Sequence, residues 1–287
     1  MVSVLTLGLL AAFAFVLLPA EHDWSELGIV WAGLVALVAI GRWIELDQSQ
    51  IIGHVFQLIG VFCLLCLLGS LAQSVLATTS LPTADAFLAR IDAKIGFDWL
   101  LTFHTWQAVP GVFLALSLVY SSLTWQPVLL ISLLAAGNRV EDAWRFLTAW
   151  GISLLAVTLI FPFFPAYANF AVLKIAPSDA PDIMVSAGWA FAKNFDALRD
   201  GSTVLIGREH LDGLVTFPSF HASAGILLAA GFASLRRWAW PFCILNALMV
   251  VSAVFVGAHY LVDILVGILV ALAGWLAAQR FVPIRRV

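Results

Sequence analysis

Long apolar runs are the feature of this chain that most limits the folds open to it. Residues 51–77 contain no Asp, Glu, Lys or Arg, and about 20 apolar residues are enough for a helix to cross the hydrocarbon core of a bilayer. Of the 287 residues, 62% are hydrophobic and only 11% are charged, which excludes a water-soluble globule of ordinary composition. The chain is therefore predicted to be an all-α, polytopic transmembrane helix bundle.

Seven segments are apolar enough to be predicted as membrane spans, although the second is short. They are Val2–Pro19, Leu27–Gly41, Ile51–Ala77, Phe146–Phe164, Val215–Leu235, Trp238–Val256 and Ala258–Ala278. An eighth stretch, Val109–Gly137, is too long for one straight crossing and tight for two, and Pro127 interrupts it. We expect Val109–Ser122 to be partly re-entrant and predict about eight spans, with nine as the alternative.

Residues 85–99 follow the third span and have the pattern of an amphipathic helix. Four apolar residues share one face of such a helix: Phe87, Leu88, Ile91 and Ile95. Three charged residues lie largely off that face: Asp85, Asp92 and Lys94. This pattern predicts a helix that lies in the membrane interface, as a structural collar or as a path for lipid entry. We divide the chain into an N-terminal transmembrane extension, residues 1–105, and a helical core, residues 106–287, which holds the candidate catalytic segments described next.

Two short segments in the core each place a histidine at the start of an apolar helix. They are Phe217-Pro218-Ser219-Phe220-His221 and Gly257-Ala258-His259-Tyr260-Leu261-Val262-Asp263. One neutral imidazole can attack phosphorus while a second, protonated, gives its proton to the departing oxygen, and a carboxylate can hold the first ring in its reactive tautomer. His259 and Asp263 are four residues apart, so on a helix they share one face. His221 follows Ser219, which can cap a helix whose free N–H groups face an anion.

These segments resemble the type 2 phosphatidic acid phosphatase superfamily of membrane lipid phosphatases and phosphotransferases. The family's second motif is Pro-Ser-Gly-His, and its third is Ser-Arg, five residues, His, three residues, Asp. The chain has Pro218-Ser219-Phe220-His221, and Ser252-Ala253 followed by His259 and Asp263 at the family spacing. The resemblance implies that His259 is the nucleophile, His221 the proton donor and Asp263 the residue that orients His259. The sequence His259-Tyr260-Leu261-Val262-Asp263 is similar to that of the branch of the family that contains inositol phosphorylceramide synthases.

The chain departs from the family pattern where phosphate would be gripped. Ala253 stands in place of the family's arginine, and the first motif, Lys, six residues, Arg-Pro, is absent. Its nearest equivalent is Lys193 with Arg199. Arginine suits bidentate contact with phosphate, so Arg199 is the first candidate for phosphate binding, with Lys193 and Ser219 beside it. Lys193 and Arg208 are the weaker candidates, and each of these two could equally be a solvated loop charge.

Basic residues indicate the orientation of the bundle. If the last three helices alternate in direction, five arginines gather at the end opposite both histidines: Arg236, Arg237, Arg280, Arg285 and Arg286. Positive residues favour the cytoplasmic side. The catalytic face is therefore expected to be periplasmic, extracellular or luminal. The long connection Ala166–Leu214 would lie on that face, as a lid over the site or as a plain loop.

The sequence predicts an integral membrane enzyme that hydrolyses or transfers a phosphoryl or phospho-head group on a lipid phosphate. Its partners would be the lipid phosphate, membrane lipids and a water or alcohol acceptor, with no nucleic acid, no cofactor and no metal. Water as acceptor makes a phosphatase, and a lipid or polyol hydroxyl makes a phosphotransferase. Because polar residues inside membrane bundles also serve packing and transport, a non-enzymatic transporter or scaffold is the competing class.

Overall fold

The computed structural model describes residues 24–78, 81–185, 187–200, 213–236 and 239–282. Their regular secondary structure is helical. The α-helices are α2 (Trp24–Asp47), α3 (Gln50–Ala77), α4 (Asp85–Lys94), α5 (Trp99–Gln107), α6 (Val112–Ser121), α7 (Gln126–Ala136), α8 (Val140–Ile160), α9 (Asn169–Val172), α10 (Ala187–Arg199), α11 (Phe220–Ala233), α12 (Ala239–Phe255) and α13 (Leu261–Phe281). Short 3₁₀ turns, η1 (Ser122–Thr124), η2 (Phe161–Phe163) and η3 (Pro177–Asp179), accompany them. The prediction of an all-α fold is confirmed for the described residues.

Several of these helices are long and apolar enough to cross a membrane. In the described residues there are four: Leu27–Asp47, Gln50–Ala77, Val140–Phe163 and Leu261–Phe281. A fifth results if α5 and the α6–η1 run, bent by 109°, count as one span, and α7, α11 and α12 are shorter apolar helices. The chain is thus a multi-pass helical bundle with four to five candidate spans. A total of eight stays a prediction, and its first span, Val2–Pro19, lies outside the described residues.

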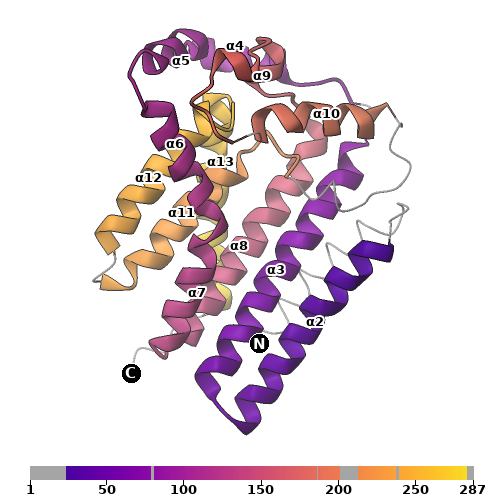
Figure 1. The fold of residues 1–287 in the computed structure, drawn as a ribbon, viewed down its shortest axis with the longest axis vertical. Coiled ribbons are helices and arrows are strands. Elements are labelled where there is room, and N and C mark those ends of the chain that lie inside the picture. Colours follow the sequence, from indigo (N-terminus) through magenta and orange to yellow (C-terminus); the bar gives the residue numbers. More distant parts are fainter. Residues whose placement is uncertain (1–23, 79–80, 186, 201–212, 237–238, 283–287) are drawn as a thin grey trace.

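The stretch around Pro127 forms two successive helices. Figure 1 shows α6 and α7 following one another from the upper to the lower end of the bundle. The 109° bend between α5 and the α6–η1 run is either a broken span or a re-entrant loop, so a partly re-entrant Val109–Ser122 stays a prediction. Pro127 lies in the first turn of α7. At that position a backbone N–H has no intrahelical partner, so a proline is tolerated and the chain continues as a second helix after a short 3₁₀ turn.

The helices α8, α11, α12 and α13 form the centre of the bundle, with α11 packed against the other three. Small residues permit the close approach of α11. A Cβ added at Gly225 would lie 2.8 Å from a methyl group of Val250 on α12, and one at Gly267 of α13 would lie 2.3 Å from the Ser219 carbonyl oxygen. Glycines on α11 and α13 therefore lie where the helices come closest.

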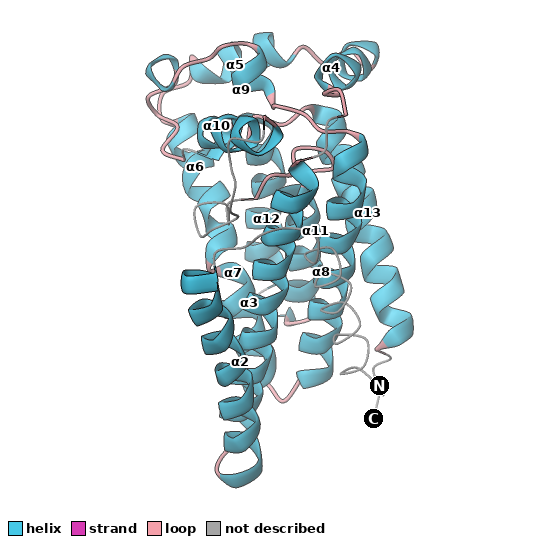
Figure 2. Cartoon of the chain, turned by 90° about the vertical axis from the view of Figure 1, so that its right-hand side faces the viewer, coloured by secondary structure: helices cyan, strands magenta, loops and turns pink. Residues whose placement is uncertain are grey.

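The two ends of the bundle differ in character. Figures 1 and 2 show α4, α5, α9 and α10 gathered at one end, where α13 begins. At the other end, Arg139 donates to the Ser234 carbonyl after α11, and Arg145 donates to the Val282 carbonyl after α13 at 2.7 Å. Basic side chains thus bind the C-terminal ends of α11 and α13, whereas His221 and His259 lie at the N-terminal ends of these two helices. Arg237, Arg285 and Arg286 lie outside the described residues.

The interfacial segment 85–99 differs from its prediction in length and in the face it buries. It forms α4 and then begins α5 at Trp99. Asp85 and Asp92 are buried with Leu88 between them, whereas Phe87 and Ile95 are exposed. The carboxylates turn inward because they accept hydrogen bonds from backbone N–H groups of other segments, and such bonds offset part of the unfavourable free energy of burying a carboxylate.

Candidate active site

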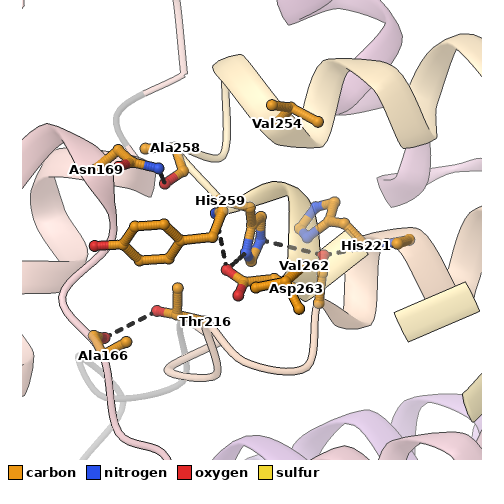
Figure 3. Close-up of polar contacts among 12 residues, drawn as sticks. Ala166, Asn169, Thr216, His221, Val254, Ala258, His259, Val262 and Asp263 are labelled. Carbon is orange, nitrogen blue, oxygen red and sulfur yellow. Dashed lines mark hydrogen bonds and ion pairs between the residues drawn. The ribbon is translucent and has the colours of Figure 1, made fainter. Parts of the chain in front are cut away.

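His259 lies in the tight connection between α12 and α13. The preceding residue, Ala258, has φ 54°, in the left-handed region that is unfavourable for a residue with a Cβ. Asn169 at the start of α9 holds this conformation, since its backbone N–H and side-chain amide both donate to the Ala258 carbonyl, at 2.8 and 3.3 Å. Figure 3 shows this contact beside His259. A strained residue held from outside is typical of functional sites.

The start of α11 is bound directly to the first turns of α13. The Ser219 N–H donates to the Asp263 carbonyl at 3.0 Å, and the Ser223 hydroxyl donates to the Gly267 carbonyl at 2.7 Å. Ser219 also caps α11, accepting from the Ala222 N–H at 3.3 Å. Because Gly267 has no side chain, Ser219 can come within reach of the helix that follows His259.

The structure brings Ser219, His259 and Asp263 into one buried chain of hydrogen bonds. His259 Nδ1 lies 3.3 Å from Asp263 Oδ2, and His259 Nε2 lies 3.2 Å from Ser219 Oγ. Ser219 and Asp263 are fully buried, and His259 is 5% exposed. Asp263 Oδ2 also accepts from the Tyr260 N–H at 3.0 Å, while Oδ1 has no hydrogen-bond partner among the described residues. A carboxylate at Nδ1 favours the tautomer with its lone pair on Nε2, the nitrogen that then accepts from the Ser219 hydroxyl.

His221 is held by a tyrosine that the sequence analysis did not identify. The Tyr120 hydroxyl lies 3.3 Å from His221 Nδ1. The two rings are stacked, with centroids 4.1 Å apart and an interplanar angle of 14°. Figure 3 shows the His221 ring at the start of α11, next to the ring of His259. With the Tyr120 hydroxyl at Nδ1, Nε2 is the other ring nitrogen of His221 at which a proton can be exchanged.

Two further residues missed by the sequence analysis, Asp85 and Asp92, contact the segment that follows His259. Asp92 accepts from the N–H groups of Leu261 and Val262, at 2.7 and 2.9 Å. Asp85 accepts from the Tyr260 hydroxyl at 3.0 Å. Burial raises the pKa of both carboxyls above the usual range. Their seven-residue spacing around Leu88, which places all three on one face of α4, is the signal in the sequence that could have found them.

Lys193 and Arg199 of α10, the predicted phosphate-binding residues, are an exposed lysine and an arginine bound to neighbouring residues. Lys193 is exposed. Arg199 donates to the Leu81 carbonyl at 2.6 Å, and its guanidinium lies 5.2 Å from the centre of the Phe195 ring. These two contacts of Arg199 are not with His221 or His259, and the role of Arg199 and Lys193 in binding phosphate stays a prediction. Arg208, a weaker candidate, lies outside the described residues.

Part of the predicted lid is folded onto the site end of the bundle. Tyr167, before α9, donates its hydroxyl to Asp196 of α10 at 2.5 Å, and this bond raises the pKa of Tyr167 to about 12. Trp189 stacks on Phe170 with ring centroids 4.5 Å apart. Between α9 and α10 lies a cavity of about 280 Å³, lined by Phe170, Ala171, Lys174, Ile175, Ala176, Gly188, Trp189 and Ala192. Its walls are apolar apart from Lys174.

Comparison with known proteins gives one match. A family model described as the PAP2 superfamily matches residues 86–277, which is more than half of the chain. No curated protein and no solved structure matches it. The matched range begins in α4 and ends in α13, so it contains Ser219, His221, His259 and Asp263.

Proposed function

The chain belongs to the PAP2 superfamily, and from this premise we propose that it transfers a phosphoryl or phospho-head group from a lipid phosphate through a phosphohistidine at His259. Membership of the superfamily implies phosphatase or phosphotransferase chemistry on a phosphate substrate. The observation that carries the proposal is the hydrogen-bonded chain Ser219–His259–Asp263, beside His221. Together they supply a nucleophile, a group that orients it and a proton donor.

The first half of the reaction breaks the ester. The lone pair of His259 Nε2 attacks phosphorus, and the bond between phosphorus and the leaving oxygen breaks with its electron pair on that oxygen. His221 donates a proton to the leaving oxygen. Asp263 stabilises the charge that develops on the His259 ring by accepting its Nδ1–H.

The second half releases the phosphoryl group. The acceptor hydroxyl gives its proton to His221, now a base, and its oxygen attacks phosphorus while the bond between phosphorus and His259 Nε2 breaks. Water as acceptor gives inorganic phosphate or a phosphorylated head group. A lipid or polyol hydroxyl gives a new phosphodiester or phosphomonoester, the outcome expected of the inositol phosphorylceramide synthase-like branch.

The negative charge of the phosphate must be stabilised by hydrogen-bond donors or cations at the site. Ser219 and the first N–H groups of α11 are suited to this task, because the N-terminus of a helix favours anions. Ala253, at the position of the family's arginine, is completely buried among apolar residues such as Phe255 and Ala222. A cation must therefore come from elsewhere, and the candidates are the basic residues of the lid, Arg199 first and Lys193 second.

The serine–histidine–aspartate chain also allows a second candidate function. Ser219 Oγ at 3.2 Å from His259 Nε2 has the arrangement of a serine hydrolase, in which Ser219 would be the nucleophile and His259 its base. Against this, the Ser219 oxygen already accepts the Ala222 N–H as the cap of α11. We therefore favour His259 as the nucleophile.

The test is turnover by the purified chain of a panel of lipid phosphates, each with and without an added alcohol acceptor. Release of inorganic phosphate that is suppressed by the acceptor, with formation of a new phospholipid, supports transfer. Release of inorganic phosphate that does not change when an acceptor is added supports hydrolysis. No turnover of any phosphate ester, with cleavage of carboxylic esters, would favour Ser219 as nucleophile. No cleavage of either ester class would favour a transporter or scaffold.

A further inference from the structure

The first turn of α13 takes its hydrogen-bond acceptors from a distant helix. The first four N–H groups of a helix lack intrahelical partners and are usually capped by a side chain close in sequence. The residue before α13, Tyr260, makes no such bond with its side chain. Asp92 of α4 accepts from the N–H groups of Leu261 and Val262 instead, one with each carboxylate oxygen.

A second carboxylate on the same face of α4 extends this contact to the neighbouring residues. Asp85 accepts from the Tyr260 hydroxyl at 3.0 Å. Its two oxygens also accept from the Tyr167 N–H, at 2.9 and 3.1 Å. We call Asp85 and Asp92 the α4 clamp. Both are buried, at 7% and 4% exposed, so their bonds compete with little water.

The clamp therefore holds three consecutive residues, Tyr260, Leu261 and Val262, which lie between His259 and Asp263 in the sequence. The hydrogen bond between His259 and Asp263 depends on the path of the backbone through them. A displacement of about 1 Å at a reacting group can lower a rate by about 100-fold. Freeing the first turn of α13 would move both ends of the His259–Asp263 pair.

We infer that Asp92, with Asp85, is a positioning residue for the nucleophile. The α4 clamp fixes the backbone turn that aims His259 Nε2 at the phosphorus and keeps Asp263 on Nδ1. This inference rests on the proposed function for its catalytic consequence. It also assigns to α4 a role in positioning His259, in addition to the two predicted roles of a structural collar and a path for lipid entry.

The experiment is substitution of Asp92 by asparagine in the full-length chain. Asp92→Asn keeps the shape of the side chain but leaves one acceptor oxygen for two N–H groups. The expected result is a kcat lowered by about 10-fold to 100-fold with KM within about twofold of wild type, because substrate binding does not depend on the aim of the ring.

Asp98→Asn is the matched control. Asp98 also caps a helix at this end of the bundle, accepting from the Leu101 N–H at 2.9 Å, but it is exposed and its bond lies within α5. Asp98→Asn should leave kcat and KM unchanged. Amide hydrogen exchange supplies a readout that needs no substrate: Asp92→Asn should speed exchange at Leu261 and Val262, and Asp98→Asn should not.

Each outcome decides one claim. Wild-type kcat in Asp92→Asn overturns the inference, and so does a change confined to KM. If the wild-type chain turns over no phosphate ester, the proposed function fails by itself, while unchanged exchange at Leu261 and Val262 would separately overturn the clamp. Should Asp92→Asn not fold, Tyr260→Phe removes only the hydroxyl bound to Asp85. It should then lower kcat several-fold with KM unchanged, and wild-type kcat there contradicts the inference.

Discussion

Substituting Asp263 by asparagine should separate activity from stability. The amide keeps the size of the side chain but places an N–H₂ group where the carboxylate accepts from His259. Loss of the equivalent carboxylate in a serine protease triad lowers kcat by about 10⁴. The Oδ2 to Nδ1 distance of 3.3 Å is longer than a strong charge-assisted bond. We therefore expect kcat lowered by about 10² to 10³, or about 3 to 4 kcal/mol in activation free energy.

The free energy of unfolding should change little in Asp263→Asn. The Tyr260 N–H loses a charged acceptor, a loss of about 1 to 2 kcal/mol. In the opposite direction, the substitution removes a fully buried charge whose Oδ1 has no partner among the described residues, and burying such a group is unfavourable. Because these effects oppose one another, we expect a shift in Tm of less than about 4 °C.

The assay is steady-state turnover of a lipid phosphate together with thermal unfolding in detergent. Asp142→Asn is the matched control at the other end of the bundle, where Asp142 pairs with Arg139 at 2.7 Å. It should lower the free energy of unfolding by on the order of 1 kcal/mol and leave kcat unchanged. An Asp263→Asn protein that keeps half of the wild-type kcat, or that loses activity only in proportion to folded protein, would show that Asp263 does not orient His259 for catalysis.

Three further predictions concern the proton donor, metals and orientation. Tyr120→Phe keeps the ring stack but removes the hydroxyl at His221 Nδ1, so kcat should fall by roughly 3-fold to 10-fold; unchanged single-turnover rates would exclude Tyr120 from the mechanism. Activity should survive exhaustive chelation, because side chains supply the charge stabilisation; loss that a divalent cation alone restores would contradict this. In a background without cysteine, Lys94→Cys should react with an impermeant thiol reagent outside intact cells and Arg280→Cys should not; the reverse labelling would place the site in the cytoplasm.

Hydropathy predicted the helical bundle because a chain in lipid must satisfy its backbone hydrogen bonds within helices. It was less informative about where helices end. The second span was predicted to end at Gly41, but α2 continues to Asp47. Polar residues extend it because they bind one another: Arg42 and Gln57 both donate to Glu45 at 2.6 Å. Such contacts between neighbouring helices leave no trace in a hydropathy profile.

The core of the candidate site could be predicted because its contacts are local or follow a known spacing. His259 and Asp263 are four residues apart on the chain, and the structure brings them within 3.3 Å. Tyr120 and Asp92 were missed because their partners lie 101 and 169 residues away. Periodicity describes one helix at a time, and a buried carboxylate is the exception to the rule that acidic residues face water. The cation that binds phosphate stays a prediction.

If His259 carries the phosphoryl group during turnover, the phosphohistidine can be trapped and located on the chain. The chain should be quenched during turnover of a substrate labelled with ³²P in the transferred group, then digested and mapped. We expect an acid-labile, alkali-stable label on the peptide that contains His259, absent from His259→Gln and from wild-type protein given unlabelled substrate. An acid-stable label on the peptide that contains Ser219, or turnover by His259→Gln at the wild-type rate, would contradict this role of His259.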